Sequence, residues 1–353
     1  MLEFKNVILY VALVAITYFF MKVLTDKNKK LSILGTILVC LSSFTIYRGV
    51  AFALILGEIA IISLDRIFAS KNKILKSLFA GLLLGTLWFY GREYSVGYYK
   101  DYALNGFTRM IFLTYLALAV WLILKNTKEL PKWKKVVFCV LPFAITIAIF
   151  AVARFHYLPF ANGVLDLDNE KNGLLHLFSY GYSMFLPFVD TGKNIVYSSF
   201  LSIFPLSLIW AMIYVYKKEK HLEFLLPMIF AIVGECVFCM LTKTSMYYDC
   251  VAGAIGLSCI YLYIYMFAHI EENIFKLADS AKIVLALLVF YFIAPRPETF
   301  MSKGYMYAIS AVITLLYFMF INFADKRYQK VLLVVLVLWS IISTVPVFFL
   351  NVM

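Results

Sequence analysis

The chain has 353 residues, of which 63% are hydrophobic and only 15% are charged, and its mean hydropathy is +0.88. Soluble chains are about 45–50% apolar and about 25% charged, so this composition argues against a soluble globular protein and predicts an integral membrane protein. The net charge of +12 comes from short basic clusters between apolar runs and not from a continuous basic face, so no nucleic-acid partner is expected.

Apolar runs close to the roughly 20 residues that cross a bilayer follow one another along the whole chain. The second and third runs are separated only by Arg48 and Gly49, so they could instead form a re-entrant pair. The predicted fold class is all-α: a polytopic integral membrane protein with about 12 transmembrane helices in a single domain, residues 1–353. We expect the spans at about 6–23, 31–47, 49–64, 76–91, 109–124, 136–153, 195–216, 222–241, 250–268, 278–294, 304–323 and 331–349.

Lys and Arg predict the orientation of these spans, because cytoplasmic loops are enriched in both residues. Most of the 32 Lys and Arg residues fall in alternate loops. Those loops should face the cytoplasm, which places both termini outside and the protein in the cytoplasmic membrane. The basic clusters lie near residues 22–30, 66–76, 125–135, 217–220, 276–282 and 326–330.

Outer loops are expected at about 92–108 and 154–194, and the second is the longest loop of the chain. It combines many aromatic residues with Asp166, Asp168 and His156. Carboxylates and imidazole can act as general bases toward a sugar hydroxyl, so these three residues are the candidate catalytic groups. The alternative is an amphipathic loop that lies at the level of the lipid headgroups, where aromatic residues are common.

Asp166, Asp168 and Glu170 also have the spacing with which a calcium loop begins. The Gly and the distant Glu of an EF-hand are missing, so we predict no dedicated metal site, although a divalent cation could bind there. The chain has no ATP-binding, zinc-helix or dinucleotide-binding motif, and no cofactor is expected.

Basic residues on the outer side run against the usual charge bias and need another explanation. Arg92, Arg154 and Lys243 are the candidate phosphate-binding residues, because guanidinium and ammonium groups bind phosphate through charge-assisted hydrogen bonds. Internal pairing with Glu93 and Asp101 is the alternative for the first outer loop. Further candidates in short outer turns, near the depth of a lipid-linked phosphate, are Asp249 and Arg296.

Glu58 and Glu235 fall inside predicted spans, where an acidic residue costs about 2.5–3.5 kcal/mol to insert. Such acids could form a proton relay, or they could pair with an inward-facing Arg, Lys or Tyr hydroxyl. The sequence leaves both explanations open.

The segment from Arg92 to Tyr102, REYSVGYYKDY, resembles the R-x-x-x-V-G-x-D-x-x-Y stretch of Wzy and EpsG-type polysaccharide polymerases. The basic turn at 217–221 and the segment 242–249 are similar to the distal half of GT-C-type glycosyltransferases. Both resemblances imply transfer of a sugar from a polyprenyl-phosphate or pyrophosphate carrier on the outer face of the cytoplasmic membrane. Basic residues would hold the carrier phosphate while a carboxylate or His deprotonates the acceptor hydroxyl.

Two other classes of protein fit the same pattern of spans. A transporter or flippase of a lipid-linked oligosaccharide, or of another envelope precursor, would use Glu58 and Glu235 as working parts. Its helices would break at prolines such as Pro142, Pro205 and Pro227. A non-catalytic scaffold would bind other envelope-synthesis proteins. The expected partners are therefore a polyprenyl-linked saccharide, membrane lipids and, within a complex, envelope-synthesis proteins.

Overall fold

The computed structural model describes residues 4–40, 48–96, 102–157, 205–242 and 245–269. Within these ranges the regular elements are all α-helices and there is no β-strand, which confirms the all-α class for this part of the chain. The helices are α1 (Phe4–Leu24), α2 (Lys29–Cys40), α3 (Arg48–Ala69), α4 (Lys73–Val96), α5 (Tyr102–Asn126), α6 (Lys132–Tyr157), α9 (Pro205–Lys218), α10 (Leu222–Thr242) and α11 (Ser245–His269).

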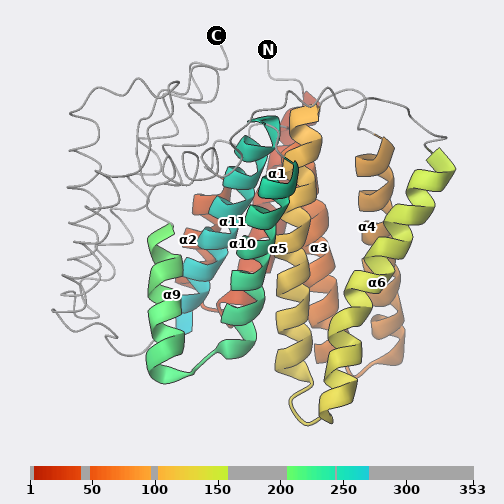
Figure 1. The fold of residues 1–353 in the computed structure, drawn as a ribbon. Helices are drawn as coiled ribbons and strands as arrows, with labels where there is room; N and C mark the ends of the chain where they lie inside the picture. The colour runs from red at the N-terminus through yellow and green to blue at the C-terminus, as the bar shows by residue number, and fades with distance from the viewer. Residues whose placement is uncertain (1–3, 41–47, 97–101, 158–204, 243–244, 270–353) are drawn as a thin grey trace, which may run out of the picture.

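The described helices form a bundle in which helices joined by a described turn run in opposite directions (Figure 1). α5 lies inside the bundle and packs against α3, α6, α10 and α11, while α4 packs against α3 and α6. Apolar side chains from most of these helices form one main core. Its largest fully buried side chains are Phe20, Trp121, Phe224 and Tyr261.

Short turns join the helices at one end of the bundle. Asn28 and Asn72 start the helices that follow two of them: Asn28 Oδ1 accepts a hydrogen bond from Leu31 N at 3.3 Å, and Asn72 Oδ1 accepts one from Ile74 N at 2.9 Å. Such caps satisfy amides that the first helical turn leaves unpaired. The described turns occupy residues 25–28, 70–72, 127–131 and 219–221.

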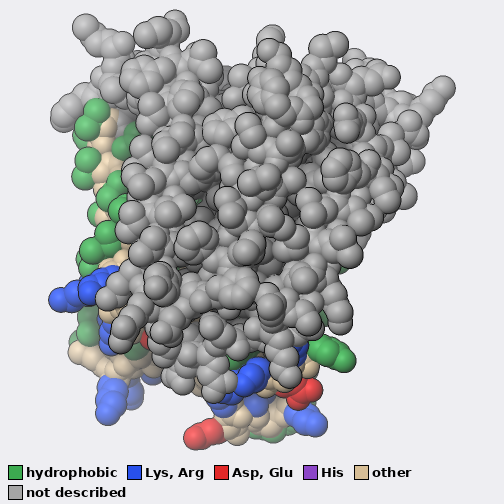
Figure 2. Space-filling model, turned by 90° about the vertical axis from the view of Figure 1, so that its left-hand side faces the viewer, with side chains coloured by type: hydrophobic (Ala, Val, Ile, Leu, Met, Phe, Trp, Pro, Cys, Tyr) green, Lys and Arg blue, Asp and Glu red, His purple; other side chains and the backbone are tan. Residues whose placement is uncertain are grey.

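Ion pairs connect these turns with neighbouring helix ends. Asp26 contacts Lys125 at the end of α5, with Nζ 2.9 Å from Oδ1. Lys128 contacts Glu223 at the start of α10, with Nζ 3.2 Å from Oε1. The basic clusters of the described residues therefore gather at this end, and Figure 2 shows Lys and Arg side chains at the lower end of the molecule. We call it the basic end.

Among the described helices, α1 contains the one segment, Val7–Leu24, whose length and hydropathy suit a membrane span. Shorter apolar segments occupy Ile111–Asn126 in α5 and Gly256–Met266 in α11. A signal sequence or the core helix of a soluble protein can also be this long and this apolar. The predicted 12 spans and the membrane location therefore stay predictions.

Helices α4, α5 and α6 extend into the predicted outer loops. Residues 92–96 belong to α4 and residues 102–108 to α5, so helix occupies most of the first predicted loop. Arg154 and His156 likewise lie in the last turns of α6. These segments contain no proline, and extending an existing helix is easier than starting a new one. Outside the described residues lie the predicted spans 278–294, 304–323 and 331–349 and most of the predicted loop 154–194.

Candidate functional site

Glu58 of α3 is fully buried in the bundle interior and is held by hydroxyl groups. Thr17 of α1 donates a hydrogen bond to Glu58 Oε2 at 2.8 Å and lies 3.1 Å from Oε1. The Tyr261 hydroxyl of α11 makes a longer contact with Glu58 Oε1, at 3.5 Å. Three helices that are distant in sequence thus meet at this carboxyl group.

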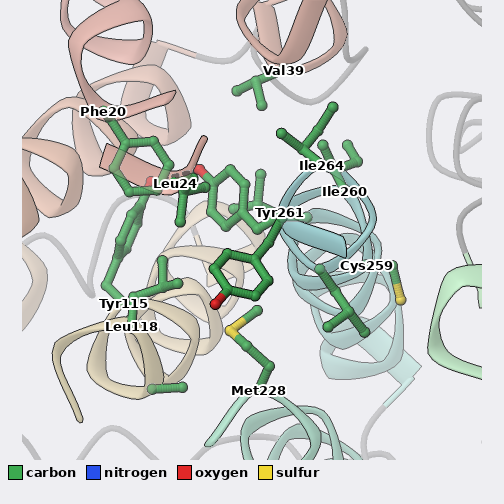
Figure 3. Close-up of a cluster of buried hydrophobic side chains, with 14 of the residues drawn as sticks. Phe20, Leu24, Val39, Tyr115, Leu118, Met228, Cys259, Ile260, Tyr261 and Ile264 are labelled. Atoms are coloured by element: carbon green, nitrogen blue, oxygen red, sulfur yellow. Dashed lines mark hydrogen bonds between the residues drawn. The ribbon is translucent and has the colours of Figure 1, made fainter. Parts of the chain in front are cut away.

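A pair of tyrosines adjoins the Glu58 carboxyl group. The hydroxyls of Tyr115 and Tyr261 lie 3.0 Å apart, and the Tyr115 hydroxyl also donates to the Leu54 carbonyl at 3.4 Å. Phe20 packs edge-on against Tyr261, with ring centroids 5.0 Å apart. Figure 3 shows these rings among apolar side chains of the core. The tyrosine hydroxyls therefore extend the polar contacts of Glu58 toward α5.

Glu235 of α10 forms a second buried cluster. Thr114 of α5 donates a hydrogen bond to Glu235 Oε1 at 2.9 Å, and the hydroxyls of Thr114 and Ser258 lie 2.5 Å apart. All three residues are fully buried. Glu235 Oε2 has no hydrogen-bond partner among the described residues.

These contacts show what the two interior acids pair with in the described part of the chain. Within the described ranges neither Glu58 nor Glu235 forms an ion pair with Lys, Arg or His, and both accept hydrogen bonds from hydroxyl groups. The sequence predicted both acids but missed their threonine and serine partners. The sequence shows which apolar helices contain a hydroxyl residue, but it does not show which helix that residue faces.

The end opposite the basic end gathers other predicted residues on neighbouring helices. Arg92 and Glu93 lie in the last turns of α4, and Arg154 and His156 lie in the last turns of α6. α4 and α6 pack against each other and run in the same direction (Figure 1). Asp249 lies near the start of α11. Five further candidates lie outside the described residues: Asp101, Asp166, Asp168, Lys243 and Arg296.

At the basic end, Asp26 joins three parts of the chain. Besides Lys125 it contacts His269 at the end of α11, with Oδ2 2.8 Å from Nε2. His269 Nδ1 lies 2.8 Å from the Tyr265 carbonyl, so both ring nitrogens lie near hydrogen-bond acceptors. The hydrogen bond from His269, together with the Lys125 ammonium, holds the pKa of the Asp26 carboxyl well below its usual range, although partial burial acts in the opposite direction.

His221 adds a second imidazole to this end. Its Nδ1 lies 3.2 Å from the Tyr265 hydroxyl, and its ring centroid lies 5.4 Å from that of His269. Partial burial and the neighbouring His269 lower the pKa of His221. These residues could not be predicted from the sequence, because nothing in it indicates that His221 and His269 lie side by side.

Within the described ranges, no three His, Cys, Asp or Glu side chains are placed to hold one metal ion. The segment 166–170, where no dedicated metal site was predicted but a divalent cation could bind, lies outside those ranges.

No protein-family model, characterised protein or solved structure matches this chain.

Proposed function

We propose that this chain is a polytopic membrane protein of about 12 spans that transfers a sugar from a polyprenyl-(pyro)phosphate carrier on the outer face of the cytoplasmic membrane. One observation carries the proposal. Arg92 and Arg154 lie near the same end of two packed helices, at the end away from the basic loops. Guanidinium groups supplied from the same end of two packed helices would suit the oxygens of one phosphate or pyrophosphate group.

The distribution of apolar side chains supports the membrane part of this proposal. Large apolar residues are exposed along α1, α4, α6 and α10, whereas polar groups such as Glu58, Thr114 and Glu235 are buried. Water would penalise this arrangement, and lipid would favour it. The basic end would then face the cytoplasm. Exposed apolar residues on these four helices include Val11, Val14, Leu78, Leu82, Val136, Val140, Phe230 and Val233.

The proposed chemistry divides two roles between the outer residues. Arg92, Arg154 and Lys243 would bind the carrier phosphate and stabilise the negative charge that develops as the carrier leaves. Asp166, Asp168 or His156 would accept the proton of the sugar hydroxyl that attacks the donor sugar. These roles follow from the resemblance to polymerases and GT-C-type enzymes and from the chemistry of the side chains.

The test uses the full chain in lipid nanodiscs with extracted polyprenyl-linked oligosaccharide. We expect Arg92→Ala and Arg154→Ala each to reduce turnover about 10- to 100-fold, because each removes a charge-assisted contact of about 1.5–3 kcal/mol. Arg66→Ala is the matched control, since Arg66 lies at the basic end of α3 and is exposed. Unchanged turnover in a folded Arg92→Ala, Arg154→Ala double variant would reject the proposed site.

A transporter or flippase of the same lipid-linked precursor is the second candidate. The buried carboxyl groups of Glu58 and Glu235 favour it, because interior acids are typical of ion and proton pathways. The described helices weaken one part of this alternative: α10 continues through Pro227, and α6 continues through Pro142, so neither proline breaks its helix. Movement of the carrier across a proteoliposome membrane without any glycosyl transfer would favour this second function.

A further inference from the structure

The environment of Glu235 differs from that of Glu58 in one respect. Both oxygens of Glu58 lie within hydrogen-bonding distance of the Thr17 hydroxyl. Glu235 receives one hydrogen bond, from Thr114 to Oε1, and its Oε2 is buried without a partner among the described residues. A buried polar atom of this kind either costs stability or marks a ligand.

The charge state of Glu235 follows from these surroundings. α10 packs against α5, α9 and α11, and none of the described side chains of these helices forms an ion pair with Glu235. The groups that face it, Thr114 and Ser258, are uncharged hydroxyls. An ionised carboxylate with one hydrogen bond and no cation is costly in a buried site, whereas the neutral carboxylic acid is not.

The hydroxyls of Thr114 and Ser258 can serve both charge states of Glu235. Each hydroxyl has one hydrogen atom, so when Thr114 donates to Glu235 Oε1, Ser258 must donate to Thr114. When a proton occupies Oε1, Glu235 donates to Thr114, which then turns its own hydrogen toward Ser258. The oxygen separations of 2.9 and 2.5 Å are hydrogen-bond lengths, so the three side chains form one hydrogen-bonded chain.

We propose that Glu235 is a proton-binding site in the interior of the bundle, with Thr114 and Ser258 as positioning residues. Binding forms an O–H bond at a carboxyl oxygen of Glu235, and the proton comes from water and returns to water on release. The neutral form is the one that fits the closed packing of α5, α10 and α11. This site is separate from the outer arginines, and its test uses no glycan, so either proposal can fail without the other.

Infrared spectroscopy of the full chain in nanodiscs tests the site, because a protonated carboxyl group has its own C=O stretching band. Near neutral pH we expect a band that shifts in heavy water and disappears in Glu235→Gln, a variant of nearly the same shape that cannot ionise. Glu58→Gln is the matched control and should leave the Glu235 band in place. Persistence of every carboxylic-acid band in folded Glu235→Gln would overturn the proposal.

Thr114→Val provides a second measurement that does not depend on how Glu235→Gln folds. It removes the hydroxyl that contacts Glu235 and keeps the shape of the side chain, so the band should persist at a shifted frequency. A band unaffected by this change would contradict the role of Thr114. Loss of the wild-type band when Na⁺ replaces K⁺ in the buffer would also overturn the proposal, in favour of a sodium site.

Discussion

Gly57 of α3 allows a close approach to α5, and this contact gives a sharp test of the bundle. A Cβ atom at Gly57 would lie 2.7 Å from Cγ of Tyr115 and closer still to Cδ2 and Cε2. Tyr115 is buried, and its hydroxyl contacts the Leu54 carbonyl and the Tyr261 hydroxyl. The ring can therefore move only by giving up these contacts or by pushing α3 away from α5.

We expect Gly57→Ala to destabilise the protein. Overpacking costs about 1–3 kcal/mol, and loss of a hydrogen bond adds about 1 kcal/mol. The better helix propensity of alanine offsets about 1 kcal/mol of this. The net loss of about 1–3 kcal/mol should lower the unfolding temperature by roughly 2–6 °C, measured by circular dichroism on the full chain in nanodiscs.

Two other glycines are matched controls for this prediction. A Cβ at Gly81 of α4 meets nothing within 4 Å among the described residues, so Gly81→Ala should not lower the unfolding temperature. A Cβ at Gly35 of α2 would lie 2.6 Å from Sδ of Met21, a flexible side chain that can move, so Gly35→Ala should cost less than Gly57→Ala. Equal stability of the Gly57 and Gly81 variants would refute the close contact of α3 with α5.

Asp26→Asn removes the ion pairs to Lys125 and His269, and because Asp26 is more than half exposed the loss should be only about 1 kcal/mol in chemical unfolding. Since His269 and Lys125 depress the pKa of Asp26, the contribution of Asp26 to the free energy of unfolding is complete above about pH 4 and is lost as the pH falls further. A difference in stability between wild type and Asp26→Asn that grew on acidification would contradict this. Glu58→Val leaves the buried Thr17 hydroxyl without its acceptor and should cost about 1–3 kcal/mol, whereas Glu58→Gln keeps an acceptor and should cost less; equal losses would count against the contact.

The sequence predicted the helices well where apolar runs alternate with basic clusters. Each described helix overlaps one of the first nine predicted spans, because the apolar face and the charged turn are both local features. The ends were less predictable. α4 continues through Arg92 and Glu93, since polar residues without a proline do not stop a helix that has already formed.

The interior contacts could not be predicted, because they depend on which helix faces meet. Thr17 and Glu58 are 41 positions apart, and Thr114 and Glu235 are 121 positions apart. Hydropathy identifies the helices that contain these residues but does not give the rotation of each helix about its axis. The pairing of carboxyl groups with hydroxyls, and not with cations, was therefore one of several arrangements compatible with the same spans.

The alternating direction of the helices places charged residues at both ends of the bundle, with the buried acids Glu58 and Glu235 between them. The alternation that brings the lysines together at the basic end also places Arg92 and Arg154 near the opposite end, because α4 and α6 both begin at the basic end. A helix of the length of α4 is about 36 Å long, so charges at the two ends do not interact directly. Any coupling between the proposed phosphate ligand at the opposite end and the basic end must therefore pass through helix packing and buried groups such as Glu58 and Glu235. Glu58→Gln and Glu235→Gln should change such coupling although neither residue lies at an end of the bundle. Arg66→Ala should not change phosphate binding at the end that holds Arg92 and Arg154.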